Sequence, residues 1–422
     1  MLDIKFIQEN TALVADAARK KRIKFDVDRL IEVDDKRRTL LAKVETKRQT
    51  QNEFNFQISQ EKNSTIKLDL VAKMKGLKDE LKKEEEDLQL IMKEWRALML
   101  AVPNIPDISV PEGNSEEENQ ELKKWGEIPK FDFPAKDHSE LMLGLGMVDF
   151  ERGTKAHGFR GYFLLGDGAK LNWAIWNYAR DFFLKEGITE IMTPSIVRKE
   201  HFYGTGHLPN EVEDLFRTQD EDFLSGTAEV PLMAYHAEEI LRKEELPKKF
   251  LAFSPCFRRE AGSHGRDVKG LIRVHEFFKF EQLVLCEARH EESEKLHEEL
   301  TERMEEFLES LDLPGRRTVV CGGELSASKV KQYEIELWVP AQNTYREIGS
   351  SSYYHDFQTR RFNTKYRNGD KNIYAHSLNN TAAPTPRLLV AIVENNQEKD
   401  GSVRVPKVLV PYLSGKTKFT KP

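Results

Sequence analysis

The sequence predicts an α+β protein: an N-terminal antiparallel α-helical coiled-coil arm, followed by a larger domain built on an antiparallel sheet. Two observations support this. The first part of the chain holds two long segments with heptad spacing of apolar residues, and the rest mixes helical segments with short apolar strands at hairpin spacing. At 422 residues the chain is too long for one ordinary domain. We expect the arm at 1–110, a linker at 111–126 and the larger domain at 127–422.

The arm is predicted from two narrow seams, in residues 30–58 and 70–98, where seam positions alternate at spacings of three and four. Between them Gln60–Thr65 is polar and able to turn, with Ser64 or Thr65 as the expected N-cap. The helices therefore fold back on each other as a rod about 50 Å long. The seam positions are Leu30, Val33, Arg37, Leu40, Val44, Lys47, Gln51, Phe54 and Ile58, and Leu70, Met74, Leu77, Leu81, Glu84, Leu88, Ile91, Trp95 and Leu98.

The arm ends at Pro103 and Pro106, because proline stops a helix. A Glu- and Asn-rich stretch, 112–121, then predicts the linker. Such an arm buries little surface of its own, so we expect it to bind a large partner. A strut for dimerisation is the alternative. In the larger domain the patterns predict helices such as Ala169–Glu186 and strands such as Glu229–Met233 and Glu334–Val339.

Composition limits the function classes. The net charge of -6 is not that of a general nucleic-acid binder, but the first 110 residues are slightly basic, which is compatible with RNA contact through that part alone. Three cysteines, Cys256, Cys286 and Cys321, form no CxxC pair, which argues against a disulfide framework and a thiolate zinc site. No apolar run of about 18 residues predicts a membrane span, and the N-terminus lacks a signal peptide's apolar core. We expect a cytoplasmic protein.

The most informative segment is Phe257–Glu281, FRREAGSHGRDVKGLIRVHEFFKFE. It predicts a strand, a polar loop and a second strand, Val274–Val284, with charged residues at both inner ends beside phenylalanines. Arg258 and Arg273 carry planar guanidinium groups that suit phosphate oxygens, and Phe277 offers an aromatic face to a base. The segment is therefore interpreted as a hairpin around an anion, and a plain surface hairpin is the alternative.

Two further segments carry oxygen ligands. In GTAEVPL, predicted to be a strand, Thr227 and Glu229 are acceptors for an ammonium group. In YREIGSSS, Glu347 and Ser350 offer the hard oxygen ligands that Mg²⁺ prefers, and a plain serine-rich loop is the alternative.

A fourth segment, LNNTAAPTPR, precedes an apolar helix predicted at Leu388–Val393 and expected to be buried. Thr385 is the expected N-cap and Pro386 the first helical residue. Arg387 then lies in the first turn, where the positive helix end attracts a phosphate. The sequence has no Walker A loop and no GxGxxG before a helix. If ATP binds, we expect it on a sheet lined by arginine and aromatic residues.

In their order along the chain, the segments resemble the class II aminoacyl-tRNA synthetases, in the form found in seryl-tRNA synthetases. The hairpin is similar to the second signature motif, GTAEVPL to the serine-pocket segment, YREIGSSSYYHDFQTRR to the metal segment, and the stretch from HSLNNTAAPTPR onward to the third motif. Ile188–Pro194 resembles the first motif, which forms the family's dimer interface. The resemblance covers essentially the whole chain.

The resemblance implies a homodimer with a class II catalytic domain. It implies that the enzyme makes seryl-adenylate from L-serine and ATP and transfers serine to tRNA(Ser), with tRNA(Sec) as a further candidate. By position, Arg258 binds the α-phosphate and Arg387 the γ-phosphate, Arg273 assists at the bent triphosphate, Phe277 stacks on adenine and Glu260 holds its edge.

The resemblance also implies a metal site and an amino-acid pocket. Glu347 and Ser350 coordinate Mg²⁺. The serine pocket is shaped by Thr227, Glu229, Arg258, Glu281, Asn379 and Thr381. A coiled-coil arm suits the recognition of RNA by shape and backbone, because duplex RNA hides its base edges. The basic residues expected to contact RNA are Arg19, Lys20, Lys21, Arg22, Arg37 and Arg38.

Two other functions stay open. One is a related ligase that activates a small amino acid but charges a carrier protein, which has no need of an arm. The other is a non-catalytic RNA-binding scaffold, which has no reason to keep Arg258, Glu260, Glu347 and Arg387.

Overall fold

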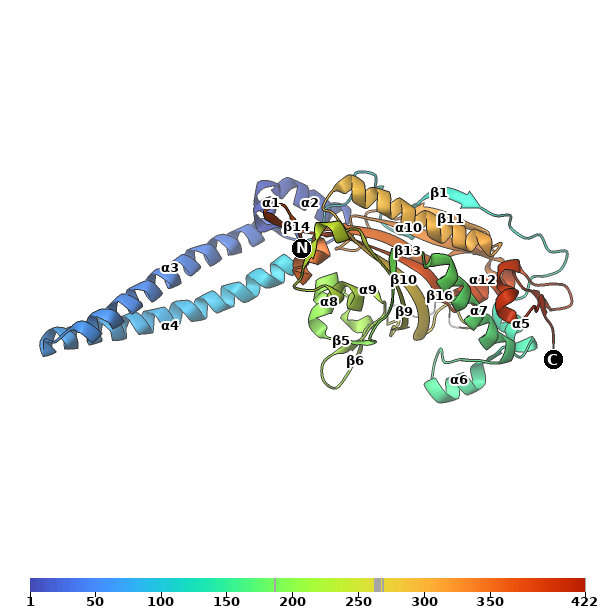
Figure 1. The fold of residues 1–422 in the computed structure, drawn as a ribbon, viewed down its shortest axis with the longest axis horizontal. Coiled ribbons are helices and arrows are strands. Elements are labelled where there is room, and N and C mark those ends of the chain that lie inside the picture. The colour runs from blue at the N-terminus through green and yellow to red at the C-terminus, as the bar shows by residue number, and fades with distance from the viewer. Residues whose placement is uncertain (186, 262–266, 268, 422) are drawn as a thin grey trace. The chain divides into compact units, whose positions relative to one another are not determined.

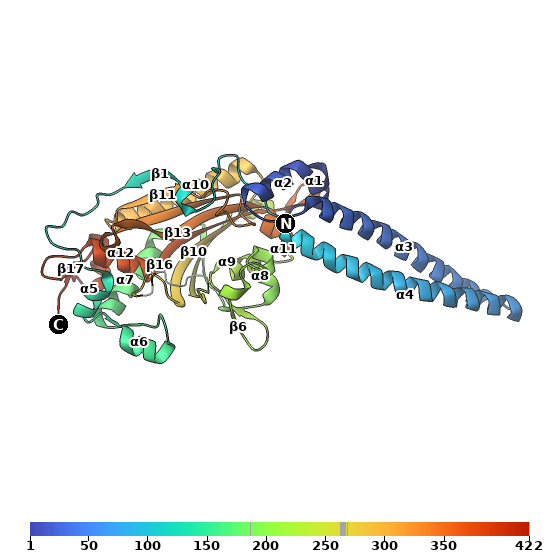
Figure 2. The ribbon, with the colours of Figure 1, turned by 180° about the vertical axis from the view of Figure 1, so that it is seen from behind.

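The computed structural model describes residues 1–185, 187–261, 267 and 269–421. The chain forms two compact units, Met1–Arg19 with Ile23–Pro103, and Lys20–Arg22 with Asn104–Pro422 (Figures 1 and 2). The first unit is helical, and the second contains every strand that the structure describes. No helix in the described part of the chain is both long enough and apolar enough to cross a lipid bilayer.

The first unit contains helices α1 (Ile4–Glu9), α2 (Thr11–Lys20), α3 (Val27–Gln60) and α4 (Ser64–Ala101). Helices α3 and α4 pack side by side as the predicted hairpin (Figure 1). The predicted N-cap of α4 is wrong. Asn63 is the cap, because its side-chain oxygen accepts from the backbone N–H groups of Thr65 and Ile66.

The predicted seam of the hairpin is confirmed. Each of its positions is buried or half-buried, including the polar ones. Two of the polar positions meet each other, since Lys47 Nζ lies 3.1 Å from Glu84 Oε1. A third, Arg37, has its guanidinium 4.7 Å from the centre of the Trp95 ring. The seam therefore keeps its heptad register through charged and aromatic pairs as well as apolar ones.

The second unit is built on an eight-stranded sheet of order β1-β11-β12-β13-β16-β10-β9-β4. All neighbours are antiparallel except β4 and β9, which are parallel. The strands are β1 (Gln120–Trp125), β4 (Ile188–Met192), β9 (Lys248–Phe257), β10 (Glu276–Cys286), β11 (Gly315–Val319), β12 (Lys331–Val339), β13 (Thr344–His355) and β16 (His376–Thr385). The predicted antiparallel sheet is confirmed.

Helices and short strands surround this sheet. The helices are α5 (His138–Gly144), α6 (Phe150–His157), α7 (Gly166–Phe183), α8 (Lys199–Thr205), α9 (Glu229–Tyr235), α10 (His290–Ser310), α11 (Phe357–Phe362) and α12 (Arg387–Asn395). The short strands are β2 (Val148–Asp149), β3 (Phe163–Leu164), β5 (Ile196–Val197), β6 (Phe216–Arg217), β7 (Phe223–Leu224), β8 (Ile240–Arg242), β14 (Lys365–Asn368), β15 (Lys371–Tyr374), β17 (Val403–Arg404) and β18 (Lys418–Phe419).

The stretch 111–126 is not the open linker that its composition predicts. Its second half forms β1, which pairs with β11 at the edge of the sheet. Trp125 ends this strand, is 7% exposed, and donates through Nε1 to the backbone oxygen of Leu313 at 3.1 Å. Backbone pairing and one buried indole thus fix a segment whose polar side chains suggest a linker.

The segment Glu229–Met233 is also wrongly predicted, because it begins helix α9 and is not a strand. Pro231 lies in the first turn, where its missing N–H costs no intrahelical hydrogen bond. Glu229 is the first helical residue, where the positive end of the helix favours a carboxylate. An apolar run of this length fits a strand or a helix, and its proline position favours the helix.

Helices α7 and α12 match their predictions apart from their ends. Helix α7 begins at Gly166 and ends at Phe183, and the predicted end at Glu186 lies outside the described residues. Helix α12 is buried along its length, as predicted. Its predicted N-cap is wrong, since Thr385 ends β16 and its Oγ1 accepts from Trp176 Nε1 at 3.1 Å.

The strands of the predicted hairpin are β9 and β10. Strand β10 begins and ends two residues later than predicted, and loop residues 262–266 and 268 lie outside the described part of the chain. Strand β10 also pairs with β16, where Glu281 faces Thr381 and Leu283 faces Asn379. This register joins the hairpin segment and the LNNTAAPTPR segment on one sheet.

Candidate active site

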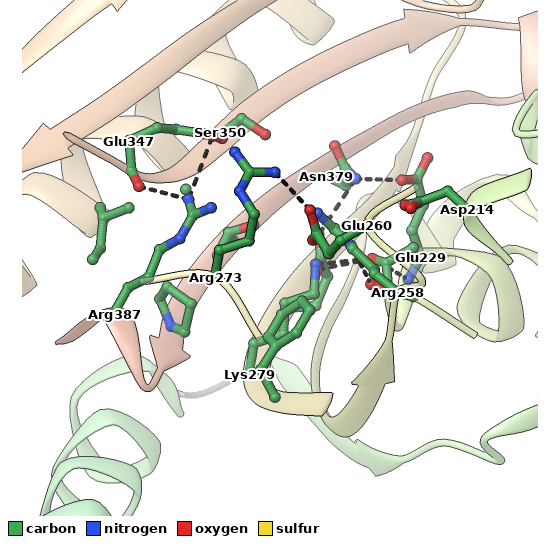
Figure 3. Close-up of a pocket in the computed structure, with 18 of the residues that line it drawn as sticks. Asp214, Glu229, Arg258, Glu260, Arg273, Lys279, Glu347, Ser350, Asn379 and Arg387 are labelled. Carbon is green, nitrogen blue, oxygen red and sulfur yellow. Dashed lines mark hydrogen bonds and ion pairs between the residues drawn. The ribbon is translucent and has the colours of Figure 1, made fainter. Parts of the chain in front are cut away.

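One cavity of the second unit collects the side chains that the sequence singles out (Figure 3). Its volume is about 320 Å³, and its walls come from β10, β13 and β16, from α9, and from the first residue of α12. All the residues predicted to hold ATP, Mg²⁺ and serine line it: Thr227, Glu229, Arg258, Glu260, Arg273, Phe277, Glu281, Glu347, Ser350, Asn379, Thr381 and Arg387.

Two buried carboxylates, Glu229 and Glu281, share one amide donor in this cavity. Asn379 Nδ2 donates to Glu229 Oε2 at 2.8 Å and to Glu281 Oε1 at 3.3 Å. The sheet register explains the meeting, because Glu281 pairs with Thr381 and Asn379 lies two residues away on the same face of β16. Carboxylates buried this deeply require such hydrogen-bond donors.

Glu229 is held by neutral donors. Besides Asn379, Gln358 Nε2 of α11 donates to Glu229 Oε1 at 2.6 Å, and Gln358 Oε1 in turn accepts from Ser377 Oγ at 2.8 Å. The Tyr354 hydroxyl donates to Asn379 Oδ1 at 3.1 Å, and burial, followed by the nearby Glu229 charge, raises the pKa of Tyr354. Among the described residues no lysine or arginine forms an ion pair with Glu229. Its negative charge is therefore available to a cation.

Glu281, in contrast, is already neutralised. Lys279, on the same face of β10, forms an ion pair with Glu281 and donates to Thr227 Oγ1 at 2.9 Å. The Thr227 hydroxyl donates to Glu281 Oε2 at 3.2 Å, which closes a triangle of three buried side chains. The two neighbouring carboxylates thus differ in charge environment.

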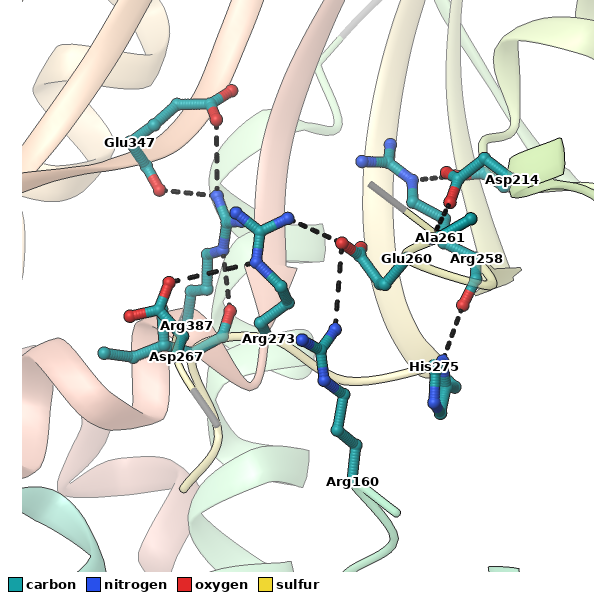
Figure 4. Close-up of polar contacts among 12 residues, drawn as sticks. Arg160, Asp214, Arg258, Glu260, Ala261, Asp267, Arg273, His275, Glu347 and Arg387 are labelled. Carbon is teal, nitrogen blue, oxygen red and sulfur yellow. Dashed lines mark hydrogen bonds and ion pairs between the residues drawn. The ribbon is translucent and has the colours of Figure 1, made fainter. Parts of the chain in front are cut away.

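Arg258 forms another wall of the cavity. Its Nε donates to the backbone oxygen of Gly226 at 3.3 Å, and its guanidinium lies 5.2 Å from the centre of the Phe277 ring. Its backbone N–H donates to the His275 oxygen at 2.8 Å, while His275 Nδ1 lies 3.0 Å from the Arg258 oxygen (Figure 4). The terminal nitrogens of Arg258 make no hydrogen bond to a residue that the structure describes. They remain available for an anion.

Arg273 and Glu260 bind each other, as Figure 4 shows. Arg273 Nη1 donates to Glu260 Oε2 at 2.6 Å, and Arg273 Nε lies 3.8 Å from Asp267 Oδ2. Burial alone lowers the pKa of Arg273, but Glu260, Asp267 and Glu347 outweigh it and raise that pKa. The guanidinium is therefore permanently charged within reach of any bound polyanion.

Arg387 opens helix α12 and is fixed by two backbone oxygens. Its Nη1 donates to the Glu347 oxygen at 2.6 Å, and its Nε donates to the Ile272 oxygen at 3.1 Å. The Glu347 side chain is 46% exposed, and Ser350 lies three residues further along β13 in the same cavity. A carboxylate and a hydroxyl are hard oxygen donors, and Mg²⁺ commonly takes only one or two protein ligands while keeping several waters. The two side chains fit that ion.

The cavity therefore has two chemically different regions. One has an unneutralised carboxylate beside a neutralised one, suited to a small molecule with an ammonium and a hydroxyl group. The other has three arginines, Arg258, Arg273 and Arg387, with the Phe277 ring beside Arg258, suited to a nucleotide polyphosphate. Such a site acts by positioning and charge neutralisation.

The basic residues predicted to contact RNA fall into two groups. Arg19 and Arg38 have side chains 60% and 56% exposed, although both pair with nearby aspartates, and Arg37 is largely covered and bound to Asp34. In the second unit, Lys20 and Arg22 donate to the backbone oxygens of Val110 and Asn114.

Lys21 does not fit the RNA-contacting set. It is 3% exposed, and its ammonium donates to the backbone oxygens of Ser326, Ala327 and Lys329. Burial lowers its pKa, and the Lys329 charge lowers it further. Because a buried ammonium cannot reach a phosphate, we withdraw Lys21 from that set.

The sequence reasoning missed three residues that support the site. Lys279 lies between Phe277 and Glu281 at alternating positions of one strand. Because alternate side chains of a strand share a face, this spacing could have identified it. Gln358 and Tyr354 carry no local signal, because they reach Glu229 and Asn379 only through the packing of α11 and β13.

Comparison with known proteins agrees with this geometry. Residues 211–396 match the tRNA synthetase class II core domain (G, H, P, S and T), and residues 1–106 match the seryl-tRNA synthetase N-terminal domain. The serine–tRNA ligase of Deinococcus radiodurans is 43% identical over 424 residues, covering 100% of both chains. That of Thermodesulfovibrio yellowstonii is 42% identical, covering 98% of this chain and 99% of the relative.

Solved structures agree as well. The seryl-tRNA synthetase of Pyrococcus horikoshii, complexed with ATP, superposes with a TM-score of 0.90 at 34% identity over 100% of both chains. The cytoplasmic serine–tRNA ligase of Naegleria fowleri, in complex with AMP, gives a TM-score of 0.86 at 33% identity over 100% of this chain and 99% of that one. Over its whole length, the chain belongs to the seryl-tRNA synthetase family of class II aminoacyl-tRNA synthetases.

Proposed function

We propose that this protein is a serine–tRNA ligase. It activates L-serine with ATP to seryl-adenylate and transfers serine to the 3′ end of tRNA(Ser). The observation that carries the proposal is the cavity, in which an unneutralised carboxylate, a neutralised carboxylate and three arginines meet in a chain that matches this family from end to end. Transfer to tRNA(Sec) is a further proposed reaction of the same site.

ATP is proposed to lie along the arginine-rich region. Arg258 takes the α-phosphate, Arg273 the bent triphosphate and Arg387 the γ-phosphate, while Phe277 stacks on adenine and Glu260 holds the edge of the base. Planar guanidinium groups suit phosphate oxygens. The proposal is supported by the family's ATP and AMP complexes in Pyrococcus horikoshii and Naegleria fowleri.

Glu347 and Ser350 are proposed to hold Mg²⁺, which when bound would neutralise charge on the phosphates. Their hard oxygen atoms support this assignment. Arg387 is tied to the backbone oxygen of Glu347, so the proposed metal ligand and the proposed phosphate ligand stay adjacent before any substrate arrives.

Serine is proposed to bind among Thr227, Glu229, Glu281, Asn379 and Thr381. Its ammonium group faces Glu229, its hydroxyl donates to Glu281, and its carboxylate faces Arg258. The carboxylate then attacks the α-phosphorus of ATP, and pyrophosphate leaves. This in-line displacement needs positioned reactants and stabilised charge, which the arginines supply without an enzyme nucleophile.

The helical hairpin of the first unit is proposed to contact tRNA. Its α3 and α4 carry a long polar surface outside the seam, and duplex RNA is recognised by shape and backbone. The proposed contacts are Arg37 and Arg38 on α3, Arg19 on α2, and Lys20 and Arg22 in the second unit, with the exposed Arg19 and Arg38 best suited to a phosphate.

A homodimer is proposed through the first-motif region. Strand β4 is at the edge of the sheet, and exposed strand edges invite pairing. Exposed apolar side chains gather in the same stretch of sequence: Phe159, Phe163, Leu165, Trp173, Met192 and Ile196. Light scattering on the purified protein should report a dimer.

We propose a cytoplasmic location, in keeping with the three free cysteine thiols.

Aminoacylation of tRNA(Ser) with radiolabelled serine tests the whole proposal. A carrier-protein ligase would activate an amino acid but leave the tRNA uncharged, and a scaffold would do neither. The match of residues 1–106 to the seryl-tRNA synthetase N-terminal domain favours the tRNA ligase over the carrier-protein ligase.

A further inference from the structure

We propose that Lys279 is a specificity-determining residue that assigns different tasks to the two neighbouring carboxylates. It neutralises Glu281, which then accepts the substrate hydroxyl, and it leaves Glu229 as the carboxylate that takes the substrate ammonium. This inference rests on the proposed function, because it takes serine as the substrate.

Lys279 lines the region of the cavity that contains the two carboxylates, Glu229 and Glu281 (Figure 3). It lies between Phe277 and Glu281 on the cavity face of β10 and is 4% exposed. Its ammonium contacts Glu281 and donates to Thr227 Oγ1 at 2.9 Å. A lysine this deeply buried requires a charge partner, and Glu281 is that partner.

The Asn379 amide contacts both carboxylates, and this closeness is the reason that they need different partners. Asn379 Nδ2 lies 2.8 Å from Glu229 Oε2 and 3.3 Å from Glu281 Oε1, so the two carboxylates are direct neighbours. Two like charges in one buried site disfavour double ionisation, and one of them takes up a proton unless a cation is present. Lys279 supplies that cation to one carboxylate only.

The consequence is a pocket that distinguishes the two ends of serine. Ionised Glu281 can only accept hydrogen bonds, and Lys279 and Thr227 already occupy part of its capacity. A substrate must therefore bring a hydroxyl donor, and alanine would leave the group short of a partner. An ammonium is repelled by Lys279 and goes to Glu229, whose donors Gln358 and Asn379 are uncharged.

The test compares Lys279→Met with the double variant Lys279→Met/Glu281→Gln in ATP–pyrophosphate exchange with serine and alanine. Lys279→Met should lower kcat/KM for serine about a hundredfold, mainly through KM, and alanine much less, so that the serine-to-alanine ratio falls. The double variant removes both charges and should be less impaired than Lys279→Met.

Lys249→Met is the matched control, since Lys249 lies on the adjacent strand β9 and pairs with Glu299 outside the cavity. It should keep the wild-type ratio, and KM for ATP should be unchanged in all variants. Thermal unfolding establishes which variants fold. Where Lys279→Met does not fold, serine exchange by the double variant tests the inference.

Two results would overturn the inference while serine exchange by the wild type stands. One is a folded Lys279→Met enzyme with the wild-type serine-to-alanine ratio. The other is a folded double variant that loses serine exchange completely. Absence of serine exchange in the wild-type protein would instead remove the proposed function itself.

Discussion

Arg273 Nη1 donates to Glu260 Oε2 at 2.6 Å, so the two inner ends of the central hairpin are joined by an ion pair within the active-site cavity. In the proposed function both side chains contact ATP, one at the triphosphate and the other at adenine. The ion pair therefore holds two nucleotide ligands in place before the nucleotide arrives. Such preorganisation reduces the ordering cost of binding.

Arg258→Ala should lower serine-dependent pyrophosphate exchange by about a thousandfold or more, because it removes the charge that neutralises the attacked phosphate. Circular dichroism and tRNA binding should remain close to wild type, since Arg258 makes only one side-chain hydrogen bond to the described part of the protein. Steady-state exchange kinetics measure the loss.

Arg259→Ala is the matched control for that experiment. Arg259 is the next residue, uses its backbone N–H to bind the Asp214 oxygen at 2.9 Å, and does not line the cavity. Its exchange rate should stay near wild type. If Arg258→Ala retained exchange, the assignment of the phosphate ligand would be wrong.

Glu347→Gln should raise the Mg²⁺ concentration needed for half-maximal exchange by about tenfold, because a neutral amide is a weaker ligand for a hard cation. The backbone oxygen of Glu347 still binds Arg387, so the arginine stays in place. Glu336→Gln is the control, since Glu336 binds Arg316 at 2.8 Å and lies outside the cavity. An unchanged Mg²⁺ titration for Glu347→Gln would argue against the metal site.

Deletion of Gln51–Asp69 removes the turn of the helical hairpin together with Gln51–Gln60 of α3 and Ser64–Asp69 of α4. Exchange should be preserved, because the cavity lies wholly in the other unit. Charging of tRNA(Ser) should fall about a hundredfold, as contacts to the RNA are lost. Unimpaired charging would exclude an RNA role for the tip.

Stability should depend on pH through the buried His297. Its ring stacks on Tyr333 at 4.6 Å and is 1% exposed, and burial lowers its pKa to about 4 from an ordinary value of 6.5. Between these values the unfolded chain binds more protons than the folded one, so the free energy of unfolding falls as the pH drops from 6.5 to 4.

Urea denaturation at several pH values checks this expectation. His297→Phe keeps an aromatic ring but does not titrate, so its free energy of unfolding should fall less steeply across the same window. A smaller slope should remain, because the pKa values of His355 and His376 are lowered in the same direction, chiefly by burial. An unaltered slope in His297→Phe would contradict the assignment.

The long-range organisation of this fold could be predicted where the spacing of apolar residues repeats over many helical turns. The seam from Leu30 to Leu98 is confirmed because heptads repeat many times, and the polar pair Lys47–Glu84 fits within them. Short segments were less predictable. Glu229–Met233 is helical and 120–125 is a strand, since pairing partners distant in sequence decide such short runs.

The site was predictable where one strand or one motif carries it, as with Arg258, Phe277 and Arg387. Its supporting residues were not. Gln358 reaches Glu229 only because α11 packs beside α9, and Lys21 proved to be buried because three backbone oxygens converge on it. Tertiary contacts of this kind leave no periodic signal in the sequence.

The measurement that tests the central claim most directly is serine-dependent ATP–pyrophosphate exchange on the purified protein, with threonine, alanine and cysteine as controls. We predict that serine supports exchange far better than alanine, because alanine brings no hydroxyl donor to Glu281. Exchange as fast as that with serine by any of the other amino acids would contradict the assignment of the pocket. No exchange with any of them would contradict the enzyme itself.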